Sequence, residues 1–328
     1  MTTLIERLRH PAVAPPWSNV HGLARTLLAA GTLLTLTVHD ARTLFAPTGR
    51  TLEELTASIP LARASLFFLV PDLELARWLA IAGLALVASG WRPRWTGALH
   101  WWISASFAIS CVLIDGGDQV TAVLTALLVP VTLTDPRRWH WSATPAEPRR
   151  LSGKTAALVA SSALLVTRLQ VAAIYLHAAV GKMAVTEWVD GTAIYYWFTH
   201  PVFGLPATLQ PLAMPILSSA LGVTLVTWGT IAFELLLAAA LVADRRLWRP
   251  LLVAGLAFHA GIVVAHGLVT FYFAMAGALV LYLRPHGQPF AWPGLRFSRV
   301  LGSISLIPRP RPRRREGSAA RADEASFG

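Results

Sequence analysis

Long apolar blocks separated by short arginine-rich loops are the feature that most constrains how this chain can fold. The 328 residues are 55% hydrophobic and 14% charged, whereas a soluble domain carries about a quarter charged residues. Most of the blocks are long enough to cross a bilayer as helices. The sequence therefore predicts an all-α integral protein of the cell membrane, folded as a polytopic helical bundle.

The blocks predict eight membrane-spanning helices. Seven blocks are visible, at residues 22–39, 76–90, 97–114, 119–133, 155–181, 216–243 and 251–283. The last exceeds one crossing at about 1.5 Å per residue, so we split it at His266-Gly267. Residues 59–70 are apolar but too short to cross, and are expected at the interface.

This division predicts three regions. Residues 1–20 form a cytoplasmic lead, and residues 21–285 form the transmembrane domain. Residues 286–328 form a basic tail whose proline- and arginine-rich start predicts disorder.

The charges predict the topology. Arg92, Arg138 and Arg245 stand in alternate loops that share one side of the membrane with the arginine-rich tail. Cytoplasmic loops carry such an excess of positive charge. Both termini are therefore expected in the cytoplasm, and the net charge of +11 needs no nucleic-acid partner.

Several chemistries lack a motif in the sequence. Cys111 is the single cysteine, so a thiol–quinone oxidoreductase with a redox pair is excluded. There is no Walker loop, GxSxG or HExxH motif, which argues against nucleotide-driven transport and the common hydrolase mechanisms.

Lys182 is the first candidate for catalysis. The chain has 28 Lys and Arg residues, of which only Lys154 and Lys182 are lysine. Arginine stays charged, whereas a desolvated lysine can lose its proton and act as a base. The alternative is that Lys182, at the end of an apolar run, only extends to the lipid headgroups.

Ionisable residues inside the spans are further candidates, because burying charge in a bilayer is costly. Arg168, Tyr175 and Lys182 recur every seven residues, which places them near one stripe of a helix. Glu234 is expected at the depth of Arg168. We therefore predict an Arg168–Glu234 ion pair, which either serves the site or only joins two helices.

Three histidines lie in apolar runs: His177, His259 and His266. They are candidates for proton relay or substrate contact, His177 and His266 toward the same outer side as Lys182. Their spacing matches no HxxxH or HxxH ligand pattern, so no metal site is predicted.

The stretch from Gln170 resembles the HTTM family, the membrane domain shared with vitamin K-dependent gamma-carboxylases. The shared residues are Gln170, Tyr175, Lys182, Trp188-Val189-Asp190-Gly191 and His200. Residues 25–36 and the overall length resemble the sporulation-delaying protein B branch, which acts in the maturation of secreted antimicrobial peptides. The resemblance covers about residues 20–285.

The resemblance implies that Lys182 is the base that deprotonates a reduced quinone such as vitamin K hydroquinone. It also implies site-shaping roles for Gln170, Tyr175, Trp188, Asp190, Gly191, His200 and His259. However, because the sequence ends soon after the last predicted span, we expect no counterpart of the large extracytoplasmic domain of the carboxylases. The chain also has one more residue between Lys182 and Trp188 than the animal enzymes.

Three hypotheses follow. The leading one is a membrane protein that matures or modifies an exported peptide at the outer face, together with a small partner protein. The second is a quinol-dependent carboxylase, and the third is a non-enzymatic scaffold, immunity factor or export subunit.

Overall fold

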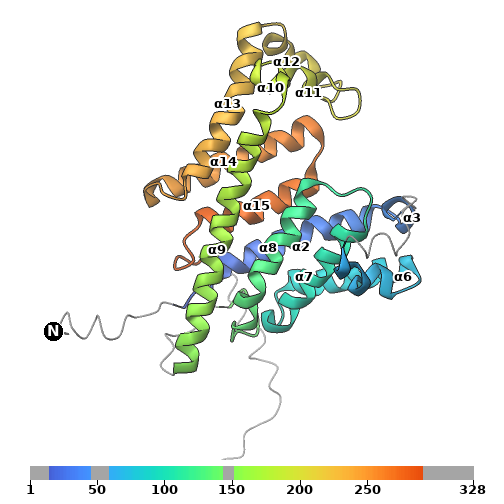
Figure 1. Cartoon of the computed structure of the whole chain (residues 1–328), viewed down its shortest axis with the longest axis vertical. Coiled ribbons are helices and arrows are strands. Elements are labelled where there is room, and N and C mark those ends of the chain that lie inside the picture. Colours follow the sequence, from blue (N-terminus) through green and yellow to red (C-terminus); the bar gives the residue numbers. More distant parts are fainter. Residues whose placement is uncertain (1–14, 46–58, 143–150, 291–328) are drawn as a thin grey trace, which may run out of the picture. The chain divides into compact units, whose positions relative to one another are not determined.

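Helices make up the fold of the part of the chain that the computed structural model describes, residues 15–45, 59–142 and 151–290 (Figure 1). These residues contain no β-strand. The eight longest helices are α2 (Asn19–Val38), α6 (Leu73–Ser89), α7 (Pro93–Ser110), α8 (Gly116–Leu133), α9 (Leu151–Lys182), α13 (Ala220–Ala239), α14 (Trp248–His266) and α15 (Val269–Leu283).

Each of these helices coincides with a predicted span. The split of the last apolar block is confirmed: α14 ends at His266, and Gly267 caps it in the left-handed conformation, with φ of 72°. Glycine adopts this conformation without the steric cost that a Cβ brings.

Four of the described helices are long and apolar enough to cross a membrane. They are Gly116–Leu133, Ser152–Lys182, Ala220–Ala239 and Arg245–His266. Helix α15 is apolar but shorter. The chain is thus a membrane protein, while eight crossings and the orientation of the termini stay predictions.

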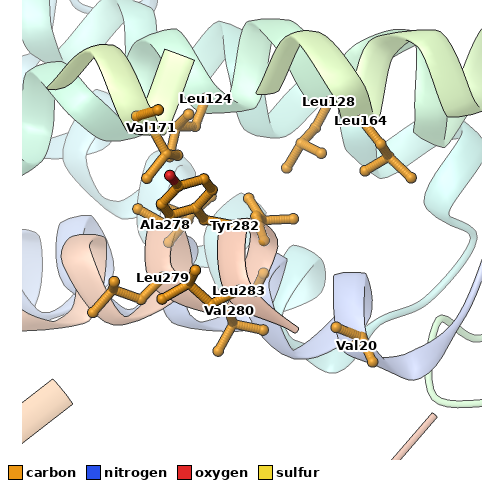
Figure 2. Close-up of a cluster of buried hydrophobic side chains, with 14 of the residues drawn as sticks. Val20, Leu124, Leu128, Leu164, Val171, Ala278, Leu279, Val280, Tyr282 and Leu283 are labelled. Atoms are coloured by element: carbon orange, nitrogen blue, oxygen red, sulfur yellow. The ribbon is translucent and has the colours of Figure 1, made fainter. Parts of the chain in front are cut away.

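The larger hydrophobic core joins α2, α8, α9 and α15. Figure 2 shows its members Leu124 and Leu128 of α8 with Val171 of α9 and Tyr282 of α15. Helices α2 and α15 approach closely at Gly277, where an added Cβ would lie 3.0 Å from the Leu28 side chain. Small residues commonly permit such contacts between membrane helices.

A second core joins α2, α6 and α7 with the short elements before α6. These are α3 (Ala41–Leu44), η1 (Pro60–Ala64) and α5 (Leu66–Leu69). The predicted interfacial segment 59–70 lies in η1 and α5. Its Phe67 packs on Phe107 of α7, with ring centroids 6.4 Å apart.

The connection between α9 and α13 includes three short helices. It contains α10 (Thr186–Val189), α11 (Ala193–Thr199) and α12 (Gln210–Leu217). Helices α11 and α12 pack on α13. A single 3-10 turn, η2 (Arg245–Leu247), joins α13 to α14.

The described chain continues past the predicted end of the transmembrane domain. The Asn19 side chain donates to the Phe290 carbonyl and accepts from its N–H, both at 2.8 Å. The predictions for residues 1–14 and for the tail from residue 291 lie outside the described residues.

Candidate functional site

Lys182 is the last residue of α9 and forms an ion pair with Glu234 of α13. Its Nζ lies 2.8 Å and 2.7 Å from the two carboxylate oxygens, and 3.3 Å from the Ala178 carbonyl. An ammonium has three N–H donors, and each has an acceptor here. The side chains are only 21% and 9% exposed, so Lys182 turns into the bundle and does not extend to lipid headgroups.

Trp188 covers this pair from the connection after α9. The Lys182 Nζ lies 5.1 Å from the centroid of the Trp188 ring, within the range of a cation–π interaction. The ring therefore shields one side of the ammonium from solvent.

Gly191 allows that connection to lie on α13. It has φ of 75°, and a Cβ there would come within 2.9 Å of Thr224 and 3.1 Å of Trp228. Only glycine avoids both the backbone strain and the contact. The Asp190 side chain is exposed, and its backbone N–H closes a turn to the Thr186 carbonyl.

A second polar pair lies beside the first. The Tyr175 hydroxyl of α9 is 2.9 Å from Nε2 of His259 on α14. Both residues are buried, and His259 Nδ1 has no hydrogen-bond partner within the described residues. Tyr175 and Lys182 lie on the same helix, seven residues apart.

The predicted Arg168–Glu234 ion pair is wrong. Glu234 pairs with Lys182, and Arg168 donates through Nε to the Tyr282 carbonyl at 3.0 Å. The Arg168 guanidinium lies 4.0 Å from the Trp248 ring centroid. The depth of Glu234 was misjudged because α13 begins well beyond the end of α9, alongside α11 and α12.

The stripe of seven-residue spacing does face the bundle, but each member meets a different helix. Arg168 binds α15, Tyr175 binds α14 and Lys182 binds α13. One face of α9 thus organises the polar contacts of three neighbouring helices.

The structure does not bring His177 and His266 to Lys182. His177 is exposed on α9, because it follows Tyr175 by two residues and so faces the other way at about 100° per residue. His266 Nδ1 lies 2.6 Å from the Phe203 carbonyl, so His266 ties the end of α14 to the connection before α12.

Two other predicted site residues also lie apart from the pairs. The exposed His200 accepts the N–H groups of Val202 and Phe203 on its Nδ1, at 3.1 Å and 3.0 Å. His200 therefore has a structural role, because it stabilises this turn. Gln170 is half-buried on α9, about three helical turns before Lys182.

Sequence reasoning missed a buried polar cluster between α2, α7 and the loop after α8. Arg25, 1% exposed, donates to Thr96 at 3.1 Å and lies 3.3 Å from His140 Nδ1. Burial and the charge of Arg25 hold the pKa of His140 well below its usual value. His140 is therefore neutral, and its Nδ1 can accept from Arg25.

Arg137 completes this cluster. Its guanidinium donates to both carboxylate oxygens of Asp135, at 3.0 Å to Oδ1 and 2.8 Å to Oδ2, and to the Ser18 carbonyl at 3.3 Å. The contacts span three distant segments. The feature of the sequence that could have indicated this cluster is the presence of arginine inside or beside apolar blocks.

No group of three or more His, Cys, Asp or Glu side chains with metal-binding geometry occurs within residues 15–45, 59–142 and 151–290.

The fold and the site together define a class of protein: an all-α membrane protein with a partly buried Lys–Glu pair inside its helical bundle. The chain belongs to the HTTM family. The HTTM domain matches residues 128–286, which include Tyr175, Lys182, Glu234 and His259.

Two relatives place the chain in the SdpB-like branch of that family. It is 43% identical over 276 residues to the uncharacterized protein YitO of Bacillus subtilis (strain 168), covering 82% of this chain and 86% of the relative. It is 40% identical over 273 residues to the sporulation-delaying protein SdpB of the same organism, covering 83% of each. No solved structure matches the chain.

Proposed function

We propose that this multi-pass protein of the cell membrane matures or modifies an exported, antimicrobial-type peptide at the extracytoplasmic face. The Lys182–Glu234 pair beside Tyr175–His259 carries the proposal. Similarity to the sporulation-delaying protein SdpB supports a peptide-related role. A small partner protein and the peptide itself are the expected partners.

The pair offers a route to a neutral amine, which can act as a base. A proton that moves from Lys182 Nζ to Glu234 across the 2.7 Å hydrogen bond leaves a neutral amine and a neutral acid. Low polarity favours neutral forms over ions, relative to water. The amine then accepts a proton from the substrate, and that proton passes to water after product release.

Tyr175 and His259 would orient the substrate in this scheme. The Nδ1 atom of His259 has no partner among the described residues, and a buried polar atom without a partner is costly. A hydrogen bond from a bound substrate would remove that cost. Trp188 would limit the access of water to the amine.

Quinol-dependent carboxylation is a second candidate, favoured by the surroundings of His259. The rings of Phe258 and Phe271 lie 5.2 Å and 5.6 Å from the His259 ring. Apolar side chains around the unpartnered Nδ1 of His259 suit the aromatic ring and hydroxyl group of a quinol. A bound quinol, once deprotonated and oxidised by molecular oxygen, would supply the strong base that carboxylation of glutamate requires, and His259 would orient its hydroxyl group.

Substitution of Lys182 tests the proposal. The protein and a precursor peptide are produced together in cells, and active secreted peptide is measured. Lys182→Arg keeps the charge but not a removable proton, so active peptide should fall about a hundredfold or more, the lower end of the effect of removing a general base.

Lys154→Arg is the matched control, because Lys154 is the other lysine and lies at the opposite end of α9. It should leave the yield unchanged. Full yield from Lys182→Ala, with normal insertion, would instead support a non-enzymatic scaffold, immunity or export role.

A further inference from the structure

A cavity rich in arginine lies where α15 ends and α14 begins. Its volume is about 210 Å³. Its lining residues are Arg245, Trp248, Arg249, Leu252, Leu283, Arg284, Pro285 and Gln288. The lining thus holds three guanidinium groups and no carboxylate.

A fourth arginine adds to the positive charge. Arg168 stacks on Trp248 with its guanidinium carbon 4.0 Å from the ring centroid, and that of Arg245 lies 5.4 Å from the same ring. Within the described segments, the ion pairs join Arg77 to Glu74, Arg137 to Asp135 and Lys182 to Glu234. The arginines around Trp248 are in none of them.

The nearest acidic side chain in sequence is already engaged. Asp244 accepts the backbone N–H of Arg246 at 2.8 Å. Arg284 donates to the Gln288 carbonyl at 3.2 Å, yet its Nε is buried without a partner among the residues described. Clustered like charges and an unpaired donor both favour the binding of an anion.

The donors suit phosphate, since the planar guanidinium fork matches its oxygens. The surroundings suit a lipid. Leu252 and Leu283 line the cavity, and the flanking Leu247 and Val253 are 50% and 61% exposed. A ligand with a phosphate and adjoining apolar chains would meet both features.

We propose that this cavity binds the phosphate of an anionic phospholipid. The three lining arginines hold the headgroup, Trp248 forms the floor beside Arg168, and the acyl chains follow the exposed apolar side of α14. Basic pockets between membrane helices recognise anionic headgroups in this way. The inference does not depend on the proposed peptide chemistry.

A lipid titration tests the proposal. The full-length protein is purified in neutral detergent and titrated with phosphatidylglycerol, with phosphatidylcholine or with inorganic phosphate, and bound lipid is counted by native mass spectrometry. We expect saturable binding of one phosphatidylglycerol, and weaker binding of phosphatidylcholine.

The variant Arg245→Gln/Arg249→Gln removes two exposed arginines of the lining. Each arginine contributes about 1 kcal/mol of attraction to an anionic lipid, so the loss of both should lower the affinity for phosphatidylglycerol about thirtyfold. The single variant Arg246→Gln changes the same loop outside the cavity, and should alter affinity less than threefold by general charge alone.

Two results would overturn the inference. An equal loss per charge removed in Arg246→Gln would show unspecific attraction to the basic loop. Inorganic phosphate that binds as tightly as the lipid, or displaces it at equal concentration, would show a site for free phosphate.

Discussion

Each donor of the Lys182 ammonium has an acceptor, and its ion pair with Glu234 joins α9 to α13. A partly buried lysine without a counter-charge is unfavourable, because burial penalises the charged form. Glu234 therefore supports both the stability of the bundle and the proton chemistry proposed for the amine.

Glu234→Gln should destabilise the protein by about 3 kcal/mol, since it leaves Lys182 charged without its partner. The measurement is thermal unfolding in detergent. The double variant Lys182→Met/Glu234→Leu removes both charges and should recover most of the loss. Equal stability of Glu234→Gln and the parent would contradict the ion pair.

His140 makes stability depend on pH. Its pKa is lowered in the folded protein, first by burial and then by the charge of Arg25. The unfolded chain thus binds a proton more readily below about pH 6.5, so stability falls as the pH drops through that value and beyond. The pKa of His286 is also lowered by burial, so His140→Gln should reduce this dependence between about pH 7 and pH 5 in unfolding experiments without abolishing it. An unchanged slope would exclude His140 as its source.

At the scale of elements, α9 and the connection that follows it build the site together. Helix α10 carries Trp188 to the amine, and Gly191 lets the next turn lie on α13. The helical blocks were predictable from their apolar lengths, and so was the break at Gly267. The helices α10 to α12 were not, because their short segments lack a clear apolar period.

Two glycines separate the role of this turn from a general effect of substitution. Gly191→Ala should cost about 1–3 kcal/mol, because alanine is strained at positive φ and its Cβ would meet Thr224 at 2.9 Å. Peptide production should fall as Trp188 moves. A Cβ on Gly181 meets nothing within 4 Å, so Gly181→Ala should be neutral or stabilising by up to about 1 kcal/mol. Similar results for both variants would contradict the packing described here.

The register between α9 and α13 also escaped sequence reasoning. Equal depth was expected for Arg168 and Glu234, but the helices α10 to α12 displace α13 along α9, so Glu234 meets Lys182 instead. The Arg25–His140–Arg137 cluster escaped for a related reason. Its members come from segments more than a hundred residues apart, which no local pattern reveals.

For the whole molecule, the alternation of basic loops predicts that the Lys182 end of the bundle faces outward. The chain offers a clean test, because Cys111 is its only cysteine and Cys111→Ser removes it. Single cysteines are then placed at the exposed positions Glu187 and Arg246. In intact cells, a membrane-impermeant maleimide should label position 187 and spare position 246 until the membrane is opened. The reverse pattern would overturn the predicted topology.

The proposed role of the Lys182 amine is to act on an exported peptide. The most direct measurement is the mass of the secreted peptide from cells that carry the parent protein, Lys182→Arg or Lys154→Arg, each inserted at equal level. We predict the same mature mass with the parent and Lys154→Arg, and an unmatured or unmodified peptide with Lys182→Arg. A peptide of mature mass in normal amount from Lys182→Arg would contradict this prediction.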